Sequence, residues 1–139
     1  MRRKFLAKAL SKTAVLGVML SLACSSGVFA YQSSHVSGSA PVRGGYMDDY
    51  NVSHSIEGNV NCSGTIAWEE GIACWVVDAT FDASASIDGA GVSLDASEPI
   101  TIRGNVAYRR FKINNSNKYV KGILTCDDYG DSSISGTVE

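Results

Sequence analysis

The stretch FDASASIDGAGVSLDA, residues 81–96, carries an apolar side chain at every second position on both sides of Asp88-Gly89. Alternation with a period of two is the pattern of a half-buried β-strand, and the dipeptide Asp-Gly favours a two-residue hairpin turn. The predicted apolar pairs are Ile87 with Ala90, Ala85 with Val92, Ala83 with Leu94 and Phe81 with Ala96. The stretch therefore predicts an antiparallel hairpin with one buried face.

The polar face of this hairpin holds a candidate carboxylate pair, because the same register sets Asp82 opposite Asp95. Like charges directly opposed on a sheet destabilise it unless a cation, a proton or a partner compensates. Oxygen ligands of this kind suit calcium, and two carboxylates at such a separation also serve glycosidases. Exposed carboxylates can equally turn outward into water. We favour this last interpretation, so the sequence predicts no cofactor.

The rest of the chain also has the pattern of short strands. Beyond Tyr46, apolar residues recur at every second position, and no stretch of ten residues keeps a helical period. Turn signals separate about seven such segments, the last of them at residues 133–138. A chain of 139 residues is long enough for one domain. The sequence therefore predicts a small all-β antiparallel sandwich, with a small closed barrel as the alternative.

Further turns fix the expected strand registers. A three-residue loop at 69–71, ending in a glycine suited to the left-handed conformation, puts Ile66 opposite Cys74. The four residues 114–117 are expected to form the loop of another hairpin. Just before it, the apolar pattern slips by one position at Arg109-Arg110, which indicates a β-bulge.

The first thirty residues have the pattern of an export signal. A basic leader precedes the apolar run 14–23, which is too short to span a membrane because a spanning helix takes about 20 apolar residues. Val28-Phe29-Ala30 then supplies the small residues of a cleavage site, so the mature chain is expected to begin at Tyr31. The stretch 20–24 resembles a bacterial lipobox, and lipid attachment at Cys24 is the alternative.

The expected mature chain divides into a lead-in and one domain. Residues 31–45 are rich in Ser and Gly and show no period, which indicates a flexible linker. The single β-domain is expected at residues 46–139.

Cations in the mature chain are concentrated in one hairpin. Residues 1–30 contain five cations and no acids, so the remainder has 7 Lys and Arg against 14 Asp and Glu, a net charge of −7. This acidity argues against nucleic acid as a partner, because phosphate binding needs clustered cations. Six of the seven cations fall within residues 103–121. The candidate binding residues are Arg103, Tyr108, Arg109, Arg110, Lys112, Lys118, Tyr119 and Lys121.

The predicted register sets Arg110 opposite Lys121 and Lys112 opposite Tyr119, on the exposed face of this hairpin. Cations and tyrosines on one face suit an anionic cell-wall polymer or an acidic glycan, bound through phosphate or carboxylate groups. The acidic surface of a second copy is another candidate partner. The structural alternative is an edge hairpin whose charges discourage aggregation.

Three cysteines remain in the mature chain, and export would permit disulfides. The expected register leaves Cys62 about 13 Å along the strand from the residue opposite Cys74, which is beyond disulfide reach. We therefore predict a Cys74–Cys126 disulfide, with Cys62 as a buried, inert thiol.

No arrangement of nucleophile, base and orienting group can be defended around His35 and His54, so the sequence predicts a protein without enzymatic activity. The leading hypothesis is a secreted bacterial binding module that acts at the cell surface or in the extracellular medium. The alternatives are a small secreted bacteriocin-like toxin and a self-assembling surface protein.

Overall fold

The computed structural model describes residues 31–139. The expected signal peptide, residues 1–30, and the alternative lipid-attachment site at Cys24 lie outside the described residues.

Within residues 31–139 the structure contains nine strands and no helix. It therefore has no helix there that could cross a membrane. The strands are β1 (Gln32–Met47), β2 (Ser53–Glu69), β3 (Ala73–Ile87), β4 (Ala90–Val92), β5 (Leu94–Asp95), β6 (Thr101–Arg103), β7 (Val106–Ile113), β8 (Tyr119–Cys126) and β9 (Ser132–Val138).

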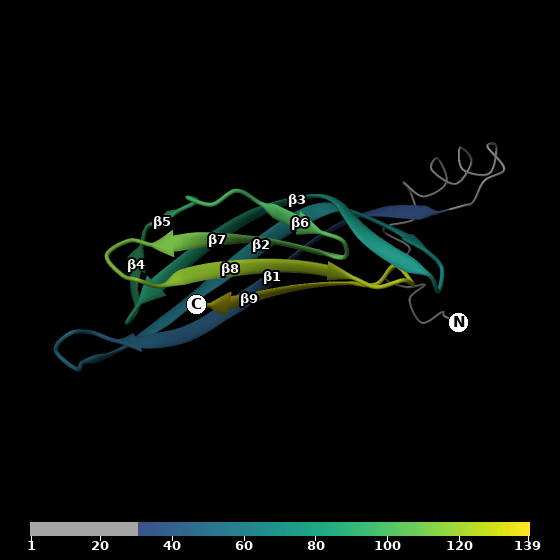
Figure 1. Cartoon of the computed structure of the whole chain (residues 1–139). Helices are drawn as coiled ribbons and strands as arrows, with labels where there is room; N and C mark the ends of the chain where they lie inside the picture. Colours follow the sequence, from purple (N-terminus) through teal and green to yellow (C-terminus); the bar gives the residue numbers. More distant parts are fainter. Residues whose placement is uncertain (1–30) are drawn as a thin grey trace.

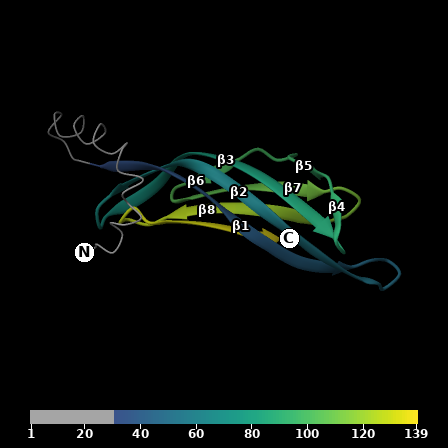
Figure 2. The same ribbon diagram turned by 180° about the vertical axis from the view of Figure 1, so that it is seen from behind.

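The strands form two antiparallel sheets that pack face to face, as Figure 1 shows and Figure 2 confirms from behind. One sheet has the order β1-β2-β3-β4. The other has the order β5-β7-β8-β9, with β6 also paired to β7. The predicted all-β sandwich is confirmed, and the two sheets do not close into a barrel.

The prediction of a flexible linker at residues 31–45 is wrong, because this segment forms most of strand β1. It pairs with β2 along its whole length, from Gln32 opposite Trp68 to Met47 opposite Ser53. A Ser- and Gly-rich segment can form a long strand here because its backbone hydrogen bonds are satisfied by a neighbour. Its composition gave no sign of that neighbour.

The β2–β3 hairpin has a different register from the one expected. Its three-residue loop is 70–72 rather than 69–71, so Gly71, with φ of 73°, occupies the middle of the loop instead of its end. This shift moves the partners next to the loop by two residues, so Ile66 lies opposite Val76 rather than Cys74. A β-bulge between Thr65 and Ile66 adds one more residue beyond that point, where Thr65 lies opposite Asp78.

The Asp88-Gly89 turn forms as predicted, and both of its residues have positive φ. Ile87 pairs with Ala90, and Ala85 pairs with Val92. The hairpin then ends, contrary to expectation, because the chain crosses to the other sheet after β4. There Leu94 pairs with Ile113 instead of Ala83.

The β7–β8 hairpin has the predicted loop and register, with Arg110 opposite Lys121 and Lys112 opposite Tyr119. The predicted bulge at Arg109-Arg110 is absent, since the pairing runs without a shift along β7. The even-numbered Tyr108 belongs to the outer face, whereas the buried residues of β7 are odd-numbered. The sequence pattern counted the outward-facing Tyr108 as a core residue, and this produced the false signal of a bulge.

The core lies between the sheets and is built mainly from β2, β3, β7 and β8. Its largest fully buried side chains include Ile56, Ile66, Ile113 and Leu124. The two sheets approach closely at Gly122, where an added Cβ would lie 2.6 Å from Val60. A side chain at this position would therefore push the sheets apart.

Candidate functional site

The outer face of the β7–β8 hairpin carries two cations, each stacked on a tyrosine. The Arg110 guanidinium lies 4.1 Å from the ring centre of Tyr119, and the Lys121 ammonium lies 4.4 Å from that of Tyr108. Each pair runs diagonally across the two strands, as the register requires. We call Tyr108, Arg110, Tyr119 and Lys121 the cation–tyrosine face.

Two glutamates hold the cations of this face in place. Glu98 accepts a hydrogen bond from Arg110 at 3.0 Å. Glu139 bridges both cations, with oxygens 3.2 Å from Arg110 Nε and 3.3 Å from Lys121 Nζ. Arg110 and Lys121 lie directly opposite each other, so this bridging carboxylate relieves the repulsion between like charges. The side chains remain partly exposed, at 31% for Arg110 and 22% for Lys121.

The other predicted cations do not share this arrangement. Arg109 belongs to the inward-facing residues of β7, where its guanidinium lies 5.5 Å from the ring centre of Phe111. Lys112 donates a hydrogen bond to the backbone carbonyl of Ser116. Arg103 is exposed at the end of β6, and Lys118 follows the β7–β8 loop. Of the eight predicted binding residues, four thus form the cation–tyrosine face, and the other four lie outside it.

The predicted carboxylate pair does not exist. Asp82 lies opposite Asn61 in one sheet, and Asp95 lies opposite Lys112 in the other. The pair fails because the hairpin at Asp88-Gly89 stops after β4. Within residues 31–139, no cluster of three or more His, Cys, Asp or Glu side chains is arranged to hold a metal ion.

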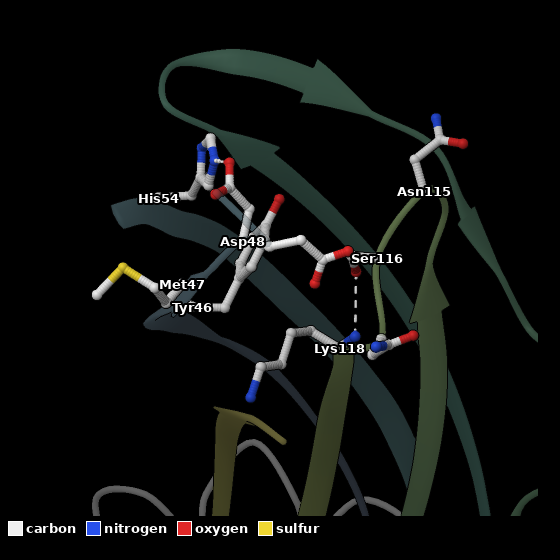
Figure 3. Close-up of a pocket in the computed structure, with 9 residues that line it drawn as sticks. Tyr46, Met47, Asp48, His54, Asn115, Ser116 and Lys118 are labelled. Atoms are coloured by element: carbon white, nitrogen blue, oxygen red, sulfur yellow. Dashed lines mark hydrogen bonds and ion pairs between the residues drawn. The ribbon is translucent and has the colours of Figure 1, made fainter. Parts of the chain in front are cut away.

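A second candidate site, which sequence reasoning missed, is a cleft between the β1–β2 connection and the β7–β8 loop (Figure 3). Its volume is about 380 Å³. Figure 3 shows His54 beside Asp48 on one wall, with Asn115, Ser116 and Lys118 on the other. The sequence offered no signal for this cleft, because its walls come from segments about sixty residues apart.

His54 binds a carboxylate through each ring nitrogen. Nε2 lies 2.8 Å from Asp48 Oδ2, and Nδ1 lies 2.6 Å from Asp88 Oδ2. Two carboxylates can both accept hydrogen bonds only from a doubly protonated imidazole, so this geometry favours the charged form. The hydrogen bond to Asp48, followed by the one to Asp88, raises the pKa of His54. The Tyr46 ring stacks on the imidazole, with centres 4.9 Å apart.

The pKa values of the two carboxylates shift in the direction opposite to that of His54. The hydrogen bond from His54 lowers the pKa of Asp48. The backbone N–H of Ser55, followed by His54, lowers the pKa of Asp88. His54 therefore links the β1–β2 connection to the β3–β4 turn by charge-assisted hydrogen bonds.

Comparisons of the chain with protein-family models, curated proteins and solved structures found no match. The functional argument therefore depends on the geometry of the two sites.

Proposed function

We propose that this protein is a secreted, non-enzymatic binding module that holds an anionic polymer on its cation–tyrosine face, at the cell surface or outside the cell. The supporting observation is the pair Arg110 and Lys121, side by side and each stacked on a tyrosine. Stacked cations lose less freedom on binding than free side chains do, which favours recognition of a charged ligand.

The ligand chemistry follows from the donors. A guanidinium and an ammonium on a sheet face can each bind a phosphate or a carboxylate, and successive groups of a polymer can occupy both. Candidate ligands of this class are teichoic acids and acidic glycans. Glu98 and Glu139 already contact the cations, so the ligand must displace or share these carboxylates. We therefore expect moderate affinity that falls as salt rises.

A binding role is also more consistent with the histidine than a catalytic role. Both ring nitrogens of His54 contact carboxylates, and the doubly protonated ring that this geometry favours has no lone pair for general-base chemistry.

Retention on immobilised polyglycerol phosphate and on polygalacturonate tests the proposal. The two polymers separate phosphate from carboxylate preference. We expect the double variant Arg110→Glu with Lys121→Glu to lose retention on the preferred polymer by at least about tenfold, because two attractive charges become repulsive. Glu98→Gln should increase retention, since it removes a competing carboxylate.

The matched control is Arg103→Glu with Lys118→Glu, which changes the net charge equally but lies outside the cation–tyrosine face. It should retain most of the binding. Equal losses in both double variants would contradict the proposal, because they would show a response to net charge alone. Circular dichroism and the melting temperature confirm that each variant folds.

A further inference from the structure

Two cysteines from opposite sheets meet at the end of the sandwich that lies far from His54. Cys74 belongs to β3 and Cys126 is the last residue of β8. The Cys74 thiol donates a hydrogen bond to the backbone carbonyl of Cys126, with sulfur and oxygen 2.9 Å apart. Both cysteines are unbridged in this structure, as is Cys62. This contact places the two residues against each other across the sheets.

The backbone around Cys126 is held firmly. Its N–H donates to the carbonyl of Asn105 at 3.1 Å, and its carbonyl also accepts a hydrogen bond from the Asn105 side chain at 3.2 Å. On the facing strand, Cys74 lies opposite the buried Trp68. Neither cysteine is on a loop, so their proximity is a property of the packed sandwich.

We propose that Cys74 and Cys126 are a disulfide-forming pair that joins the two sheets covalently. The oxidant is a small or protein disulfide. The Cys74 thiolate attacks one oxidant sulfur and forms a mixed disulfide, releasing one thiol. The Cys126 thiolate then attacks Cys74 Sγ, displaces the second oxidant thiol and completes the bond. The two cysteines lose two electrons and two protons, and the oxidant gains both as two thiols.

The order of attack follows from exposure. Cys74 is partly exposed, whereas Cys126 is buried, so an oxidant in solution reaches Cys74 first. Burial raises the pKa of both thiols, and the neighbouring Cys74 thiol raises that of Cys126 further. The reduced, folded protein is therefore a slow substrate, and the bond forms most readily while the chain is folding.

Cys62 supplies an internal control. It is buried on β2 opposite Phe81, and burial raises the pKa of its thiol to about 11. Once the chain has folded, Cys62 is therefore expected to keep its thiol.

The test uses the full chain with Cys24→Ser in every version, which removes the fourth thiol. The reduced protein is unfolded, refolded in a mixture of reduced and oxidised glutathione, and then alkylated in denaturant without reduction, so that buried thiols also react. We expect a mass loss of two hydrogen atoms, one alkylated cysteine at Cys62, and a proteolytic peptide pair linked through Cys74 and Cys126. Three alkylated cysteines, a glutathione adduct that persists, or a bond that includes Cys62 would overturn the proposal.

The single variants sharpen this result. Cys62→Ser should keep the bond and leave no thiol to alkylate, whereas Cys74→Ser should leave two alkylated cysteines and no bond. Reduction of the refolded parent should lower its melting temperature by roughly 10 °C, because the bond closes a loop of about fifty residues in the unfolded chain. An unchanged melting temperature would contradict a link between the sheets. Since polymer retention and bond formation are measured separately, either proposal can fail alone.

Discussion

The two ends of the sandwich are stabilised by different kinds of contact. At the tryptophan end, which comprises Trp68, Cys74, Cys126 and Gly130, residues of both sheets pack closely around the buried Trp68 and Cys126. The turns also join there, since Gly71 N–H donates to the carbonyl of Asp128 at 2.9 Å. At the histidine end, which comprises Asp48, His54 and Asp88, partly exposed charged side chains connect two turns.

This difference has consequences for how each end responds to change. Close packing makes the tryptophan end sensitive to added volume. Charge-assisted hydrogen bonds make the histidine end sensitive to pH. The open cleft beside His54 is thus built on the end whose geometry depends most on protonation.

The largest expected effect is that of Gly130→Ala at the tryptophan end. Gly130 has φ of 85°, and an added Cβ would lie 2.4 Å from the ring of Trp68. The substitution combines left-handed strain with a clash against a buried indole, so we expect a loss of about 3 kcal/mol or more in the free energy of unfolding. Urea denaturation measures it.

Gly89→Ala at the histidine end is the matched control. Gly89 has nearly the same conformation, with φ of 87°, but no atom lies within 4 Å of an added Cβ. Gly89→Ala should lower the free energy of unfolding only by the cost of the left-handed conformation, about 1 kcal/mol. Equal losses at the two glycines would show that packing at the tryptophan end contributes nothing beyond backbone strain.

A smaller effect is expected from pH at the histidine end. The raised pKa of His54 stabilises the fold below the ordinary value of 6.5, and this contribution is lost as pH rises through the folded-state pKa. The lowered pKa values of Asp48 and Asp88 stabilise it above 3.8, and this contribution is lost as pH falls through their folded-state values. The fold should therefore gain most from this cluster between about pH 4 and 6.5.

His54→Gln tests this pH dependence. Its melting temperature, followed from pH 3 to 9, should fall furthest below that of the parent inside this window and approach it on the alkaline side. The Gly130→Ala deficit should stay nearly constant over the same range. A His54→Gln deficit that does not vary with pH would show that the side chain acts by packing on Tyr46 alone.

The sequence was sufficient for the fold class and for the hairpins with strong turn signals. Asp88-Gly89 and the loop at 114–117 formed as predicted because their local turn chemistry fixes the register. The hairpin at Gly71 was displaced by one position, since a glycine can occupy more than one place in a three-residue loop. That shift moved the partners next to the loop by two residues, and a β-bulge between Thr65 and Ile66 moved the rest by one more.

The remaining errors concern contacts between distant segments. Strand β1 depends on pairing with β2, and the crossing after Val92 depends on pairing between β5 and β7. Neither has a local signal. The candidate site was predicted in part, because the β7–β8 register placed Arg110 beside Lys121. The carboxylates that hold these cations, Glu98 and Glu139, come from outside that hairpin and were missed.

The smallest expected effect comes from the tip of the β1–β2 connection, next to the histidine cluster. Tyr50 is 87% exposed, and the tip is held by Asp48, whose Oδ1 accepts hydrogen bonds from the backbone N–H groups of Tyr50 and Val52. Tyr50→Ser leaves both hydrogen bonds intact, so the free energy of unfolding should change by less than about 0.5 kcal/mol. Tyr46→Ser removes the ring stacked on His54, so it should lower the free energy of unfolding by more than Tyr50→Ser does. If Tyr50→Ser were the more damaging variant in urea denaturation, the tip would be stabilised by its exposed ring rather than by Asp48, and the charged cluster would not be what organises this end.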